Sequence, residues 1–145
     1  NTSLRPFSAF YQRLRPANYA ALLRLAALGG TPAQWEKTIL RLTSQPANEG
    51  ILAHWLALRR ERPVSRLNAL RQLIAAARYR ASLIRPPVPT LVLASARDRL
   101  VSVECSLALA RQWQCALRVH PGAGHDLPLD DGPWVAQQVC DWLPG

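Results

Sequence analysis

An acid and a histidine stand at corresponding places after two short apolar runs in the second half of the chain. Asp98 follows the run Thr90–Ser95 by three residues, and His125 follows the run Ala116–His120 by five. Such runs are typical of parallel strands that are covered on both faces. Because the carboxyl ends of parallel strands meet at one edge of the sheet, we expect Asp98 and His125 to lie close together there. A carboxylate that orients an imidazole is the pair that activates a nucleophile for hydrolysis.

Helices must connect and cover these two strands. The stretch Ser102–Trp113 predicts a helix, with Ser102 as its N-cap and Glu104 in the first turn, where the helix dipole favours a carboxylate. Its predicted buried stripe is Val103, Leu107, Ala110 and Trp113. A last helix is predicted to start after Asp130–Pro133, with Val135, Val139 and Trp142 on its buried side.

The first 86 residues predict a different organisation, made of short amphipathic helices. After an irregular stretch over residues 1–15, helices are expected over 16–28, from Pro32 to about Gln45, over 47–62 and over 64–80. Thr31 and Gln34 have the spacing of a capping box, and Gly29 and Gly30 stop the preceding helix. The inward stripes are expected to include three sets: Trp35, Ile39 and Leu42; Ile51, Trp55 and Leu58; Leu67, Leu70, Ile74 and Ala77. Proline-rich residues 81–89 form the return linker to the strands.

The run Ser95–Val101 and the pair Gly124-His125 resemble the C-terminal portion of the α/β-hydrolase family. In that family the catalytic acid follows a late strand in a turn of the type G/S-x-x-D-x-[LV]-V, and the catalytic histidine follows the last strand. The resemblance implies that Asp98 is the orienting acid and His125 the general base, in the family's chain order of acid before histidine. It also implies an α/β fold class: a helical cap over residues 1–86, then the last two strands and helices of the hydrolase sheet over 87–145, a partial fold. Asn1–Leu4 resembles the tail of the strand that leads into the cap.

The sequence departs from the family at the nucleophile. The elbow G-x-S-x-G is absent from all 145 residues, and two strands are too few for the family's central sheet. The chain also contains no methionine. We therefore expect a C-terminal fragment of an ester- or lactone-type acyl hydrolase, inactive alone, whose full-length parent binds a small acyl substrate. The alternative is a non-catalytic module that forms a homodimer or domain swap through open strand edges.

Each singled-out residue also has a structural interpretation. Asp98 could only cap the following helix, and His125 could be a loop histidine bonded to Asp126 or Asp130. The three acids of the last loop, Asp126, Asp130 and Asp131, are expected to be caps and loop ligands, and His54 and His120 to be structural. Arg97 and Arg99 would keep Asp98 ionised if they point toward it.

The distribution of charge and the cysteine content restrict the classes of partner and cofactor that we expect. Residues 1–86 hold thirteen Arg and one Lys against three Glu, a net charge of +11, and residues 87–145 carry −2. The arginines are spread around helices without interleaved aromatic residues, so nucleic acid is not the expected partner. Cys105, Cys115 and Cys140 have no metal-ligand spacing with any histidine, so we expect thiols in a reducing cytoplasm and no metal or cofactor. No apolar run is long enough for a membrane span.

Overall fold

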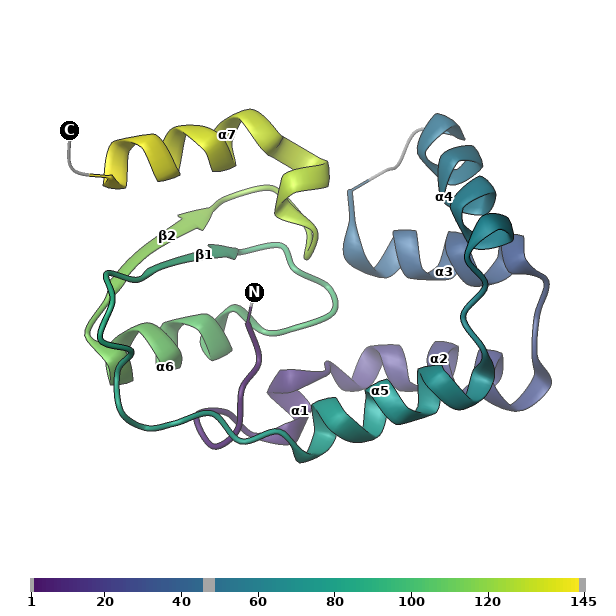
Figure 1. The fold of residues 1–145 in the computed structure, drawn as a ribbon, viewed down its shortest axis with the longest axis horizontal. Coiled ribbons are helices and arrows are strands. Elements are labelled where there is room, and N and C mark those ends of the chain that lie inside the picture. Colours follow the sequence, from purple (N-terminus) through teal and green to yellow (C-terminus); the bar gives the residue numbers. More distant parts are fainter. Residues whose placement is uncertain (1, 46–48, 144–145) are drawn as a thin grey trace.

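The computed structural model describes residues 2–45 and 49–143. Two parallel strands, β1 (Leu91–Ser95) and β2 (Ala116–His120), lie between helix α6 (Val103–Trp113) and helix α7 (Leu127–Trp142). The helices within residues 19–78 gather beside this α/β part (Figure 1). The predicted α/β class, with helices and a two-stranded parallel sheet, is confirmed.

The strand–helix–strand unit follows the local sequence signals. β1 is a five-residue run whose Val92 and Ala94 are buried, and its register with β2 pairs Leu91 with Ala116 and Ser95 with His120. Ser102 caps α6, since its side chain accepts a hydrogen bond from the Glu104 backbone N–H. At the other end, a left-handed Gln114 (φ 48°) turns the chain into β2. The predicted strands and the helix between them are therefore present.

The buried face of α6 differs from the predicted stripe. The buried residues are Cys105, Ser106, Leu109 and Ala110, whereas Val103 and Leu107 are only half-buried. The reason is a second covering layer, which comes from residues 2–15, called here the N-terminal segment. Leu4 and Phe7 pack against the cluster of Val92, Leu109 and Ala110, and the Phe7 ring meets Trp113 edge-on at 6.0 Å. The helix thus buries one side against the sheet and another against residues from the start of the chain.

The N-terminal segment is tied to the loop after β1 as well as to α6. The Arg15 N–H donates to Leu100 O at 2.9 Å, and the Ser102 N–H donates to Gln12 O at 2.9 Å. Residues Thr2–Leu4 form no strand, so the predicted strand tail is wrong for them, and Asn1 lies outside the described residues. A short helix α1 (Phe10–Arg13) stands where an irregular stretch was predicted.

The helical segment contains the predicted helices with shifted ends. The 3-10 turn η1 (Pro16–Asn18) and helix α2 (Tyr19–Leu28) share the first predicted helix, followed by α3 (Pro32–Thr43), α4 (Glu49–Glu61) and α5 (Arg66–Arg78). The capping box of Thr31 and Gln34 is present, with both reciprocal hydrogen bonds. The start predicted for the third helix, at residue 47, lies outside the described residues. Glu36 on α3 pairs with Arg59 on α4 at 2.5 Å, which joins these two helices.

Helix α5 is attached in a way that its sequence pattern does not predict. Its apolar side chains stay exposed to solvent: Leu67 57%, Leu70 52% and Ile74 43%. Two arginines of the N-terminal segment hold its C-terminal turn instead, Arg5 through Ala77 O and Arg13 through Ala76 O. Cationic groups on the last carbonyls of a helix also complement its dipole. The expectation of an inward stripe on this helix is therefore wrong.

Helix α7 begins earlier than predicted, at Leu127. Asp131 interrupts it with non-helical dihedral angles (φ −153°, ψ 74°), and Pro133 lies in the first turn after this kink. The predicted buried stripe is only partly covered, since Val135 is half-buried and Val139 is exposed. The first turn of α7 directly follows the loop Gly124–Asp126, so this loop continues into the helix without a break.

Candidate active site

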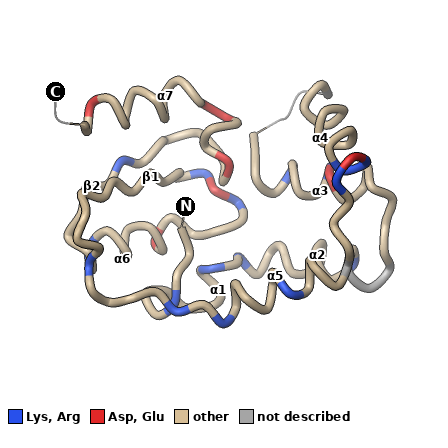
Figure 2. The backbone as a smooth tube through the Cα atoms, viewed as in Figure 1, with Lys and Arg blue, Asp and Glu red and all other residues tan. Residues whose placement is uncertain are grey.

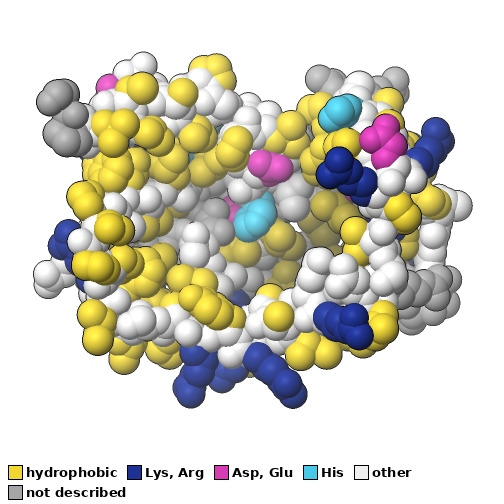
Figure 3. Space-filling model, in the orientation of Figure 1, with side chains coloured by type: hydrophobic (Ala, Val, Ile, Leu, Met, Phe, Trp, Pro, Cys, Tyr) yellow, Lys and Arg dark blue, Asp and Glu magenta, His cyan; other side chains and the backbone are white. Residues whose placement is uncertain are grey.

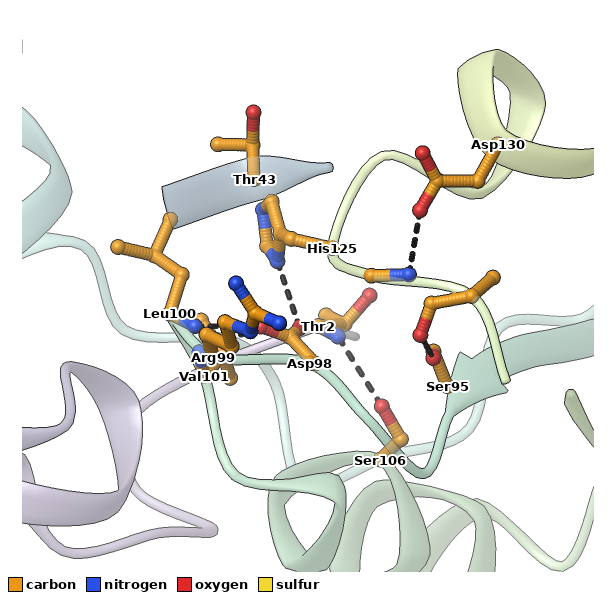
Figure 4. Close-up of polar contacts among 12 residues, drawn as sticks. Thr2, Thr43, Ser95, Asp98, Arg99, Leu100, Val101, Ser106, His125 and Asp130 are labelled. Carbon is orange, nitrogen blue, oxygen red and sulfur yellow. Dashed lines mark hydrogen bonds and ion pairs between the residues drawn. The ribbon is translucent and has the colours of Figure 1, made fainter. Parts of the chain in front are cut away.

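Asp98 is fixed in the turn after β1 by hydrogen bonds to its own side chain. Its Oδ1 accepts from the backbone N–H groups of Leu100 at 2.7 Å and Val101 at 2.8 Å, and the residue is 1% exposed (Figure 4). An aspartate that bonds the backbone two residues on forms an Asx-turn, which sets the direction of its second oxygen. The carboxylate is therefore buried, and its second oxygen has a fixed direction.

His125 lies in the loop after β2 and meets that second oxygen. Its Nδ1 is 2.7 Å from Asp98 Oδ2, where the acid side chain is fully buried and the imidazole is 29% exposed. Because an ionised carboxylate only accepts hydrogen bonds, Nδ1 carries a proton, and in the neutral imidazole Nε2 is then the acceptor nitrogen. The pair therefore combines a buried acid with a partly open base.

The pKa of Asp98 follows from these contacts. Burial alone raises the pKa, but the hydrogen bond from His125 and the backbone N–H groups of Val101 and Leu100 outweigh it and lower the pKa below its ordinary value of 3.8. Arg97 and Arg99 are exposed and do not contribute to this shift. The condition under which these arginines were expected to keep Asp98 ionised is therefore not met, and the histidine and the backbone N–H groups lower its pKa instead.

The structure thus brings together the two residues that the sequence singles out. The sheet register explains their proximity, because Ser95 pairs with His120 and both functional residues follow these strand ends within a few positions. Neither structural alternative for His125 is realised, since its Nδ1 bonds Asp98 rather than Asp126 or Asp130. Asp98 does act as a turn residue, but with one oxygen only.

His120 builds the loop that carries His125. Its Nδ1 accepts from the N–H groups of Gly122 at 3.0 Å and Ala123 at 2.7 Å, its Nε2 lies 3.2 Å from Asp131 Oδ2, and its ring packs edge-on against Trp134. Ser95 Oγ donates to Ala123 O on the same loop. The sequence gives little sign of this role beyond a histidine at a strand end before Pro-Gly.

The comparison with known protein families bears directly on this arrangement. The sequence matches the profile described as the alpha/beta hydrolase family over residues 3–138, and so spans the helical segment as well as the strands. The chain belongs to the alpha/beta hydrolase family. No curated protein matches it.

The family assignment makes the burial and hydrogen bonding of each serine in the chain relevant. Ser95 and Ser106 are buried and hydrogen-bonded, the latter accepting from the Thr2 N–H at 3.0 Å. The Ser44 hydroxyl is buried without a hydrogen-bond partner among the described residues. Ser102 and Ser65 are helix caps. None of these occupies a G-x-S-x-G turn, which the sequence lacks throughout.

Two further properties concern the described residues as a whole. Within 2–45 and 49–143, no three His, Cys, Asp or Glu side chains are grouped so that they could hold a metal ion. Across the same ranges, no helix is both long and apolar enough to cross a membrane.

Proposed function

We propose that this chain supplies the orienting acid, Asp98, and the general base, His125, of a Ser-His-Asp hydrolase that cleaves an ester- or lactone-type acyl substrate. The single observation that supports the proposal is the 2.7 Å contact between His125 Nδ1 and the fully buried Asp98 carboxylate. A fixed tautomer is what a general base of this kind needs. The nucleophile belongs to a polypeptide segment outside these 145 residues, and the chain alone does not turn over substrate.

The chemistry of these two residues follows the order of proton movements in acyl transfer. His125 Nε2 takes the proton of the serine hydroxyl as its oxygen attacks the acyl carbon, and then gives that proton to the leaving alcohol. Asp98 stays ionised throughout and stabilises the imidazolium that forms in between. In the second half, His125 takes a proton from water as the water oxygen attacks the acyl-enzyme, and it gives that proton to the serine oxygen as the acid is released.

A small-molecule substrate suits the shape of the molecule. The space-filling view shows a hollow in the middle of the molecule, between the α/β part and the helical segment, with apolar side chains around it (Figure 3). Concave, mostly apolar surfaces with few polar groups are typical of small-molecule sites. The Lys and Arg positions are scattered over many elements rather than gathered along one face (Figure 2), which favours a small acyl substrate over nucleic acid. The free thiols Cys105, Cys115 and Cys140 suit a reducing cytoplasm.

The test is labelling with a fluorophosphonate, which reacts with activated serines, on the complete product of the gene. We expect one labelled serine in a G-x-S-x-G turn, located by peptide mass spectrometry, and loss of labelling in His125→Ala. The matched control is His54→Ala, which removes an exposed histidine of α4 and leaves labelling unchanged. Labelling that survives His125→Ala would contradict the assigned base.

A second candidate function, a self-associating module without catalysis, is favoured by two observations. Among the described residues β1 and β2 pair only with each other, so each leaves one strand edge without a strand partner. The apolar side of α5 is exposed as well. In this case the protein forms a homodimer or domain swap. We then expect dimers in sedimentation velocity, weaker association in Leu70→Lys and no phosphonate labelling. A labelled serine in a monomeric protein would exclude it.

A further inference from the structure

The loop that carries His125 is attached to the end of helix α3, far away in the sequence. The Asp126 N–H donates to Thr43 O at 2.8 Å, and the Gly124 N–H donates to Asp130 Oδ2 at 2.5 Å. The Gln45 N–H in turn donates to both oxygens of Asp130, each at 3.1 Å. Both residues that flank His125 are therefore held, and Asp130 joins one of them to the helical segment. We call Thr43, Gln45, Gly124, Asp126 and Asp130 the histidine latch.

Gly124 allows the two segments to approach this closely. A Cβ atom at this position would lie 2.7 Å from Thr43 O, 3.0 Å from Asp130 Oδ2 and 3.1 Å from Ser44 Cα. Two of these atoms are backbone, so the loop and the end of α3 would have to separate. The spacing between them is thus set by backbone contact as well as by hydrogen bonds.

The position of the Asp130 carboxylate needs a specific explanation. It lies at the C-terminal end of α3, where the helix dipole disfavours negative charge. An ionised carboxylate can accept several hydrogen bonds at once, and here it satisfies two backbone N–H groups from segments that lack secondary-structure partners for them. Among the described hydrogen bonds, the loop is joined to the end of α3 by this carboxylate and by the Asp126 N–H on Thr43 O.

We propose that Asp130 is a positioning residue that holds His125 on Asp98 by fastening the histidine loop to the end of α3. The inference rests on the proposed function of His125 for its catalytic consequence, but the positioning itself is a separate claim. The end of α3 is then a fixed support of the base, and any opening of the helical segment must take place elsewhere, or it displaces His125. A misplacement of about 1 Å in such a site costs about 10²-fold in rate.

The first readout does not depend on activity. In proton NMR, the Nδ1–H of His125 should give a downfield resonance that is protected from exchange with water by its contact with Asp98. We expect Asp130→Ala to broaden or abolish this resonance. Asp130→Asn should give an intermediate result, because its oxygen still accepts from Gly124 while its amide group faces the Gln45 N–H donor.

Two further variants make the test specific. Ser44→Ala is the matched control, since it lies at the end of α3 but its buried hydroxyl bonds nothing among the described residues, and we expect a wild-type resonance. Gly124→Ala should reproduce the Asp130→Ala result while the carboxylate itself is kept, because its Cβ would push the loop away from Thr43 O and Asp130 Oδ2. A wild-type resonance in a folded Asp130→Asn and in Gly124→Ala would overturn the proposal.

The kinetic readout then uses the complete protein with its nucleophile. Asp130→Ala should lower kcat by about 10²-fold with a much smaller change in KM, because the base is displaced while the substrate pocket is kept. An equal loss in Ser44→Ala would overturn the proposal by showing a general effect of this junction. Failure of the proposed function is distinguishable: a latch-dependent resonance in a protein that never labels with phosphonate supports the positioning and contradicts catalysis.

Discussion

At the scale of single residues, the Asp98 carboxylate serves two purposes with its two oxygens. Oδ1 closes the turn after β1, and Oδ2 meets His125. The turn bonds therefore fix the direction in which the second oxygen points, so a residue that looks like an ordinary turn aspartate can orient an imidazole. This division of roles means that the fold and the site depend on the same side chain.

We predict that Asp98→Asn keeps the turn but loses the reaction. The Asn oxygen can still accept from Leu100 and Val101, whereas its NH₂ group would face His125 and favour the wrong tautomer. The expected fall in kcat is about 10⁴-fold. The measurement is ester hydrolysis by the complete protein, with Asp126→Asn as control, since this neighbour of His125 makes no capping bond through its side chain.

The lowered pKa of Asp98 also predicts a pH dependence of stability. A carboxyl whose folded-state pKa is depressed stabilises the fold above its unfolded pKa and loses this contribution as the pH falls through the folded value. Since the pKa lies below 3.8, the loss should occur below about pH 4. Urea unfolding of the wild type and Asp98→Asn at pH 6 and pH 3 checks this. A stability difference that does not shrink toward pH 3 would contradict the assignment.

At the scale of elements, helices α5 and α6 contrast in what their caps support. Ser102 caps α6 and Ser65 caps α5, each accepting a backbone N–H two or three residues on. Yet α6 is buried between the sheet and the N-terminal segment, whereas α5 exposes its apolar side. The same local bond therefore belongs to the cooperative core in one case and to a loosely held helix in the other.

Ser102→Ala should lower the global free energy of unfolding by about 1 kcal/mol, the usual effect of removing an N-cap side chain. Ser65→Ala should leave the global unfolding midpoint nearly unchanged, because α5 can open without exposing the core. Chemical denaturation followed by tryptophan fluorescence measures both. Equal losses in the two variants would show that α5 unfolds together with α6.

At the scale of the whole molecule, stability should be distributed unevenly. The buried cluster lies around β1 and α6, while α5 is held mainly through hydrogen bonds from Arg5 and Arg13. We predict that the amides of α5 exchange with deuterium well before those of β1 and α6, since regions with little apolar burial open with low free energy. Hydrogen-exchange mass spectrometry resolves these segments. Protection of α5 equal to that of β1 would indicate that a partner covers its apolar side.

The sequence predicts those parts of the molecule that local signals determine. The strand ends, the Ser102 cap and the capping box of Thr31 and Gln34 are read within a few residues, and the structure contains them. The meeting of Asp98 and His125 follows from one general rule about parallel strands. Their catalytic role stays a prediction until labelling is done.

The parts that the sequence does not predict depend on distant contacts. The buried face of α6 is shifted because Leu4 and Phe7 cover it from the start of the chain. The apolar stripe of α5 has the periodicity of a buried helix, but periodicity carries no information about whether a covering element exists. Likewise, the function of Asp130 arises only when residues 45 and 124 are brought together.

The attachment of the N-terminal segment has a consequence for synthesis on the ribosome. The Thr2 N–H donates to Ser106 Oγ, 104 residues later in the chain. Leu4 and Phe7 pack against residues of β1 and α6, which are also synthesised later. At the usual elongation rate of about 5–20 residues per second, these side chains remain without their partners for about 5–20 s. During that interval their apolar surface is open to chaperones and to other nascent chains. The beginning of the chain is thus among the last parts to reach its native place.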